Sequence, residues 1–76
     1  MFKLYVDPGH GGTDSGAMGN GLLEKDLTLD IALRIRMLLL NNYENVDVKM
    51  SRETDVFVSL TERTNAANDW QADYYL

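Results

Sequence analysis

The stretch FKLYVDPGH (residues 2–10) decides the fold of this chain. Its first five residues have aromatic and β-branched character, which predicts a strand. Asp7-Pro8-Gly9 has the composition of a turn and ends that strand. His10 therefore follows the carboxyl end of the first strand. In an open α/β sheet this is the end at which ligands bind, so we expect a functional site here.

A glycine-rich loop follows the first strand, and a long helix follows the loop. Six glycines fall within residues 9–21, a composition that lets the backbone turn sharply and come close to a ligand. Residues 22–41 carry apolar side chains at spacings of four, four and three residues, which predicts an amphipathic helix. These side chains are Leu27, Ile31, Ile35 and Leu38. Further apolar residues widen the stripe, so we expect the helix to be buried on two sides.

The second half of the chain predicts a strand, a helix and another strand. Residues 46–50 alternate apolar and polar side chains, which is typical of a strand. Ser59 and Glu62 match a capping box, so a second helix is expected from there to about Asp69. Residues 72–76 have the composition of a third strand. The order β-α-β-α-β favours an α/β fold with a twisted, at least partly parallel sheet flanked by helices.

The size and charge of the chain exclude several classes of protein. Its 76 residues allow one domain at most, and its formal charge is −5. Nucleic-acid binding is excluded because it requires a basic patch that neutralises phosphates. No apolar run approaches the ~20 residues that span a bilayer, so we expect no membrane insertion. The first residues lack the pattern of a signal peptide.

His10 and Glu24 are the candidate metal ligands. His10 is the only histidine, and Glu24 lies fourteen positions further on, where the glycine loop enters the helix. A histidine nitrogen and a glutamate oxygen can both ligate zinc. The alternative interpretations are a surface histidine and a first-turn glutamate favoured by the helix dipole. Dinucleotide binding is opposed by Asp14, which stands where a GxGxxG motif would have its third glycine.

Short segments spread over nearly the whole chain form a pattern that is specific when they are taken together. They are Asp7-Pro8-Gly9-His10-Gly11-Gly12, Asp14-Ser15-Gly16-Ala17, Glu24-Lys25-Asp26-Leu27, Met50-Ser51-Arg52-Glu53-Thr54-Asp55, Leu60-Thr61-Glu62-Arg63, Ala66-Ala67-Asn68 and Ala72-Asp73. In this order they resemble the zinc-dependent N-acetylmuramoyl-L-alanine amidase family (amidase type 3).

The resemblance implies that His10 and Glu24 hold zinc as the cofactor. It places the third ligand, a histidine, and the general-base glutamate beyond Leu76. Residues 1–76 are therefore expected to be the N-terminal part of a single amidase catalytic domain, with little or no hydrolase activity alone. No catalytic or substrate-binding residue is assigned within the chain.

The implied reaction is hydrolysis of the amide between N-acetylmuramic acid and the L-alanine of the stem peptide. Peptidoglycan is thus the expected partner, and the cell wall outside the cell is the expected location. The missing signal pattern favours release in the manner of a phage lysin, or an isolated mature domain. With a charge of −5, attachment to an anionic wall is expected from a downstream wall-binding module.

Two interpretations stand beside this one. The first is a non-catalytic module that keeps the amidase scaffold and binds wall fragments or a partner. The second concerns Arg52, Asp55 and Arg63, which we interpret as members of an ion pair or as polar helix positions that serve the structure.

Overall fold

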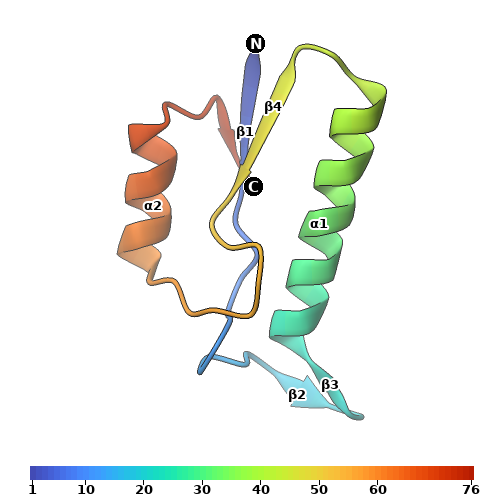
Figure 1. Ribbon diagram of the computed structural model, residues 1–76. Helices are drawn as coiled ribbons and strands as arrows, with labels where there is room; N and C mark the ends of the chain where they lie inside the picture. The colour runs from blue at the N-terminus through green and yellow to red at the C-terminus, as the bar shows by residue number, and fades with distance from the viewer.

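A parallel three-stranded sheet forms the middle of the structure, a computed structural model that describes residues 1–76. Strand β1 (Phe2–Val6) lies in the centre, between β4 (Val46–Met50) and β5 (Tyr74–Tyr75). The register of β1 with β4 runs from Phe2 opposite Val46 to Val6 opposite Met50. Strand β5 pairs with Leu4 and Tyr5. The predicted strands and their parallel pairing are confirmed (Figure 1).

The two long helices lie on opposite faces of this sheet. Helix α1 (Glu24–Asn42) connects β1 to β4, and α2 (Leu60–Asp69) connects β4 to β5. These two connections run in opposite directions across the sheet, because β4 and β5 flank β1. Right-handed crossovers in opposite directions place their helices on opposite faces. Figure 1 shows this arrangement, and the predicted α/β fold with a sheet flanked by helices is confirmed.

The core lies mainly between β1 and α1. Leu4 and Val6 are buried on one face of β1 together with Ala32 of α1. Partly buried side chains complete this cluster: Leu39, Val48 and Met50. Successive strand side chains point to opposite faces, so Tyr5 lies on the other face, where its ring stacks on Tyr75 at 5.5 Å between centroids.

The expectation that α1 is buried on two sides is wrong for the structure of residues 1–76. Ala32 is its only buried residue. Leu27, Ile31 and Leu38 of the apolar stripe are 45%, 56% and 62% exposed. The three-stranded sheet covers only the side of the helix that carries Ala32 and Leu39. The spacing thus identifies apolar positions, but their burial depends on what packs beside them.

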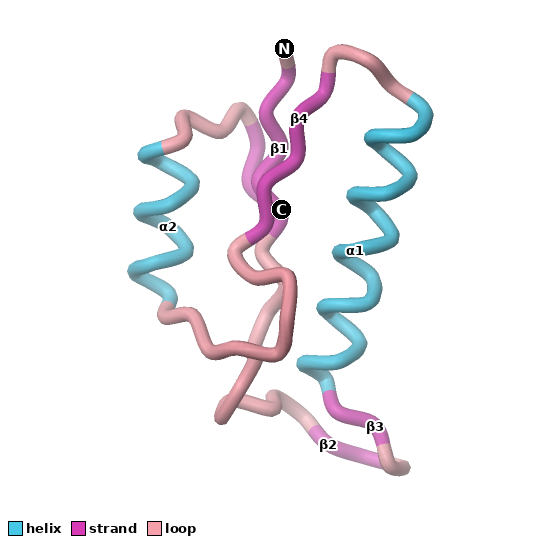
Figure 2. Tube along the Cα trace, in the orientation of Figure 1, coloured by secondary structure: helices cyan, strands magenta, loops and turns pink.

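A hairpin occupies the end of the glycine loop, where the sequence analysis expected irregular structure. Strands β2 (Met18–Gly19) and β3 (Leu22–Leu23) pair in antiparallel fashion. The turn residues Asn20 and Gly21 have φ values of 50° and 76°. Positive φ at both positions defines the type I′ turn that Asn-Gly favours. Helix α1 therefore begins at Glu24 and not at Leu22. Figure 2 shows β3 directly before this helix.

The capping box at the start of α2 is confirmed. Ser59 Oγ accepts the Glu62 amide at 3.1 Å, and Glu62 Oε1 accepts the Ser59 amide at 3.4 Å. We expect Ser59→Ala to lower the free energy of unfolding by about 1 kcal/mol, because it leaves a helix amide without its acceptor. Urea denaturation measures this. The control is Thr61→Ala, which removes an exposed hydroxyl from the same turn, and equal losses in the two variants would contradict the prediction.

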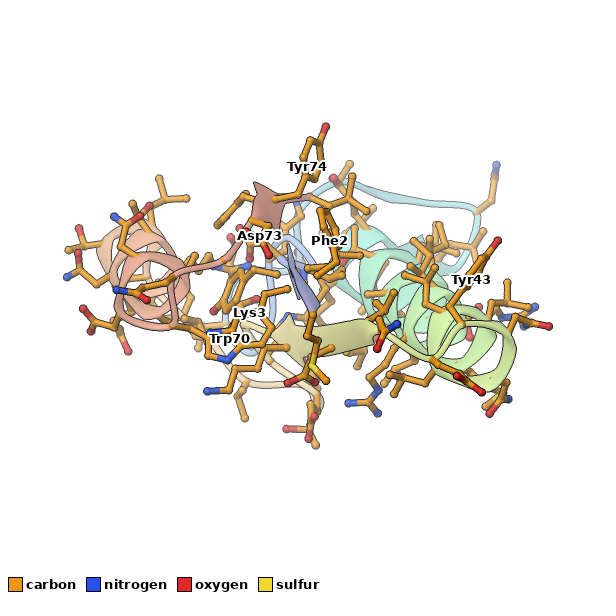
Figure 3. The ribbon with its side chains drawn as sticks, turned by 90° about the horizontal axis from the view of Figure 1, so that it is seen from above. Phe2, Lys3, Tyr43, Trp70, Asp73 and Tyr74 are labelled. Atoms are coloured by element: carbon orange, nitrogen blue, oxygen red, sulfur yellow. The ribbon has the colours of Figure 1, made fainter.

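The end of the sheet away from the glycine loop is closed by contacts around Trp70. Figure 3 looks onto this end and shows Lys3 close to Trp70, between the sheet and α2. The ammonium groups of Lys3 and Lys49 lie 5.6 and 5.4 Å from the centre of the Trp70 ring. The Lys3 amide donates to Asp73 Oδ2 at 2.8 Å.

Neither helix is both long and apolar enough to cross a membrane.

Candidate metal centre

His10 lies where the topology of an α/β sheet predicts a binding site. It follows β1, the central strand, by way of Asp7-Pro8-Gly9. The connection after β1 leads to the helix on one face of the sheet, and the connection after the adjacent strand β4 leads to the helix on the other face. Ligands bind outside the carboxyl ends of the strands at such a point. The loops after β1 and β4 lie together at this end (Figure 2).

The structure brings the two predicted ligands, His10 and Glu24, together. His10 Nε2 lies 2.9 Å from Glu24 Oε2, and both side chains are partly exposed. Glu24 is the first residue of α1, directly after the hairpin, so the turn at Asn20-Gly21 folds the helix start back onto the loop. This juxtaposition joins residues from two different elements at hydrogen-bond distance.

Asp14 holds the other side of the His10 ring, a role that the sequence analysis missed. Asp14 Oδ2 lies 3.1 Å from His10 Nδ1, and Asp14 Oδ1 accepts the amide of Gly16 at 3.1 Å. An ionised carboxylate only accepts, so Nδ1 carries the proton that is shared with Asp14. A partner of this kind fixes the tautomer and orientation of a metal-binding histidine and leaves Nε2 for the metal.

Hydrogen bonds shift the pKa values of His10 and Glu24 in opposite directions. The backbone amide of Ala17 donates to Glu24 Oε1 at 2.9 Å, and this bond, with that from His10, holds the pKa of Glu24 below its usual range. Hydrogen bonds to Asp14 and Glu24 raise the pKa of His10. Glu24 thus stays ionised with Oε2 available. A metal at this position would displace the Nε2 proton, so its binding would release that proton.

Zinc fits this donor pair as two of its ligands. Ligands at ~2.0–2.2 Å in tetrahedral geometry lie roughly 3.4 Å apart, so the pair needs to open by about half an ångström. Partly exposed side chains on a loop and at a helix start allow that movement. Catalytic zinc sites use three protein ligands, and no group of three or more metal-ligating side chains converges within the chain.

The glycine loop that carries these residues is tied to the loop after β4. Asp55 Oδ1 accepts the Gly12 amide, and Asp55 Oδ2 accepts Lys25 Nζ, both at 2.8 Å. Lys25 Nζ also donates to the Gly12 carbonyl at 3.1 Å. The bonds from Lys25 and Gly12 lower the pKa of Asp55. Asp55 therefore does form an ion pair that serves the structure, and its partner is a lysine.

A second network lies beneath His10. Asp7 accepts hydrogen bonds from Ser51 Oγ at 2.7 Å, from Arg63 Nη1 and from the Tyr75 hydroxyl. Arg63 and Arg52 are both buried. Arg63 is thus a buried ion-pair partner of Asp7. Arg52 bonds only to carbonyl and hydroxyl oxygens and has no carboxylate partner.

A pocket of about 480 Å³ opens beside His10. Its polar side is formed by Asp7, His10, Asp14 and Arg63, and its apolar side by Phe57, Val58 and Leu60. Pockets of this size bind small molecules or parts of larger ones, using an apolar wall and a few polar groups. His10 thus belongs both to the lining of this pocket and to the pair with Glu24.

The fold and the site together define an α/β domain in which a histidine after the central strand lies beside a glutamate at the start of the following helix. Comparison with known families agrees with this class. The profile of the N-acetylmuramoyl-L-alanine amidase family matches residues 4–76, and the chain belongs to that family.

Relatives of the chain carry the same description. It is 62% identical over its full length to N-acetylmuramoyl-L-alanine amidase CwlM of Bacillus licheniformis, and 59% identical to the sporulation-specific N-acetylmuramoyl-L-alanine amidase of Bacillus subtilis. The chain spans 30% of the length of each. The catalytic domain of the amidase CwlV, from Bacillus (Paenibacillus) polymyxa var. colistinus, superimposes with a TM-score of 0.94 at 32% identity. That match covers 99% of this chain and 42% of the CwlV chain.

Proposed function

We propose that residues 1–76 are the N-terminal part of a catalytic domain that hydrolyses peptidoglycan. The bond cleaved is the amide between N-acetylmuramic acid and the L-alanine of the stem peptide, and the cofactor is zinc. The observation that carries this proposal is the approach of His10 Nε2 to Glu24 Oε2 within 2.9 Å, in a chain of the amidase family. The fraction of each relative that the chain covers supports its assignment as part of a domain.

Each residue of the site has a task in this proposal. Zinc, when bound, supplies a Lewis acid and a bound water of lowered pKa. His10 holds the metal through Nε2, while Asp14 keeps the proton on Nδ1 and orients the ring. Glu24 holds it through Oε2, while the Ala17 amide fixes the other carboxylate oxygen. The pocket between His10 and Phe57 receives the part of the muramoyl peptide next to the amide.

The zinc content of the purified protein tests the proposal. In the complete catalytic domain, which in this proposal supplies the third ligand beyond Leu76, we expect about one zinc per molecule by elemental analysis. We expect His10→Ala and Glu24→Gln each to weaken zinc binding there by at least ~100-fold, because each removes a ligand. In an active preparation, hydrolysis of purified peptidoglycan should release new amino termini of L-alanine, and a chelator should stop it.

A matched control is Glu44→Gln, which makes the same change at an exposed residue after α1. This variant should keep its zinc. Zinc that survives His10→Ala would contradict the assignment of the ligands. A protein that binds peptidoglycan fragments without zinc and without hydrolysis would instead be a non-catalytic module built on the amidase scaffold.

In this proposal the location of the protein follows from its substrate, and the way it attaches to the wall follows from its net charge. It acts on the cell wall, and a separate wall-binding module attaches it, since a net charge of −5 gives no attraction to an anionic wall.

A further inference from the structure

The backbone of His10 has a left-handed conformation, with φ at 66°. A residue that carries a Cβ adopts this region at a steric cost, and it persists where the surrounding contacts determine it. Glycine would relieve the cost, but a glycine has no imidazole to present to Glu24. The structure therefore needs other groups that hold the peptide planes on both sides of His10.

Two buried arginines hold these planes. Arg52 is 4% exposed and Arg63 is 3% exposed. Arg63 donates from Nη1 to the Pro8 carbonyl at 2.7 Å and from Nη2 to the His10 carbonyl at 2.9 Å. Arg52 donates from Nε to the Pro8 carbonyl at 3.2 Å and from Nη2 to the Gly9 carbonyl at 2.9 Å. Because a peptide unit is planar, fixing the Gly9 and His10 carbonyls fixes both φ and ψ of His10.

Arg63 is the arginine that reaches His10 itself, and it is held firmly. Its Nε donates to the Val58 carbonyl at 2.8 Å, and its Nη1 pairs with the Asp7 carboxylate. Ser59 caps the helix from which it projects. A planar guanidinium with five donors in a fixed fork can bond all of these acceptors at once. The compact ammonium of a lysine cannot, even where it keeps the charge beside Asp7.

We infer that Arg63 is a positioning residue for His10: it holds the left-handed backbone that aims Nε2 at Glu24. The backbone part of this inference stands on the hydrogen bonds alone. The metal part rests on the proposed zinc function of His10.

The test is Arg63→Lys, measured in two ways. In the metal-free protein, NMR should show that His10 loses the strong cross-peak between its own amide and Hα protons that positive φ produces. In a competition titration, the dissociation constant for zinc should rise about 10–100-fold, as it does when groups that orient a ligand are changed. Far-UV circular dichroism establishes that the variant is folded at the temperature used.

The control is Arg34→Lys, because Arg34 lies on the exposed side of α1 and bonds only to Asp30. It should leave both readouts unchanged. If Arg63 had a structural role only, Arg63→Lys would lower the thermal midpoint of unfolding but leave the backbone conformation of His10 and the zinc affinity unchanged. That result in a folded Arg63→Lys protein would overturn the inference. If the wild-type protein itself bound no zinc, the proposed metal site would fail, and the NMR readout would still decide the role of Arg63.

A measurement on the wild-type protein covers the case in which Arg63→Lys does not fold. A scalar coupling across the hydrogen bond should connect Arg63 Nη2 with the carbonyl carbon of His10. A folded protein without this coupling, or with His10 at negative φ, would refute the inference.

Discussion

Replacing Asp7 with asparagine should lower the free energy of unfolding by about 3–5 kcal/mol, the cost of removing one partner of a buried ion pair. Arg63 and Arg52 are two buried cations, and Asp7 is the only carboxylate bonded to either of them. Asparagine keeps the size of the side chain but not its charge. The Arg63 guanidinium would then be buried without its counter-charge.

Urea denaturation of Asp7→Asn measures this loss. The control is Asp47→Asn on the exposed side of β4, which should change the free energy of unfolding by less than ~0.5 kcal/mol. A loss of unfolding free energy below about 1 kcal/mol for Asp7→Asn would show that hydrogen bonds to carbonyl oxygens stabilise the buried arginines without Asp7.

The same pair predicts a dependence of stability on pH. Burial raises the pKa of Asp7, but the hydrogen bonds from Tyr75, Ser51 and Arg63 outweigh it and leave the pKa lowered. A carboxyl whose pKa is lower in the folded state stabilises that state above its unfolded pKa of ~3.9, and the contribution is lost as pH falls through the folded value. The gap in stability between the wild-type protein and Asp7→Asn should therefore be full at pH 6 and shrink below about pH 4. A gap that did not change with pH would contradict this account.

Local patterns in the sequence predict most of the fold. The alternation in residues 46–50 depends on neighbours in the chain, and so does the capping box of Ser59 and Glu62, so both are visible without the structure. The hairpin had an equally local signal in Asn20-Gly21, which is a strong indicator of a type I′ turn. Its strands are only two residues long each, too short for an alternating pattern to appear.

The candidate site was predictable only in part, because its contacts combine distant residues. The resemblance to a family identified His10 and Glu24 as a pair, but it did not indicate what holds them. The bond between Arg63 and Asp7 spans 56 positions, and that between Asp55 and Gly12 spans 43. No periodicity or spacing encodes such pairs. In the sequence, Asp14 marks only the absence of a third glycine and one of the family segments, and neither indicates that it is the partner of His10 Nδ1.

Gly16→Ala should disrupt the His10–Glu24 pair directly. Gly16 has φ at +67°, and a Cβ added there would lie 2.6 Å from His10 Cδ2 and 2.8 Å from Glu24 Oε1. Both contacts are too short for non-bonded atoms, so the ring of His10, the carboxylate of Glu24 or both must move. The absence of a side chain at this position is thus what allows the two candidate ligands to meet. We expect zinc binding to weaken by at least ~100-fold, since both ligands are displaced.

The left-handed conformation adds a separate cost, and Gly21→Ala isolates it. Gly21 also has positive φ, at +76°, but nothing lies within 4 Å of its added Cβ. Both variants should lose about 1–2 kcal/mol of stability from backbone strain alone. Only Gly16→Ala should also lose zinc, as measured by competition titration at a temperature where both variants are folded. Equal zinc affinity in the two variants would mean that His10 and Glu24 do not bind the metal together, and the proposed metal centre would have to be abandoned.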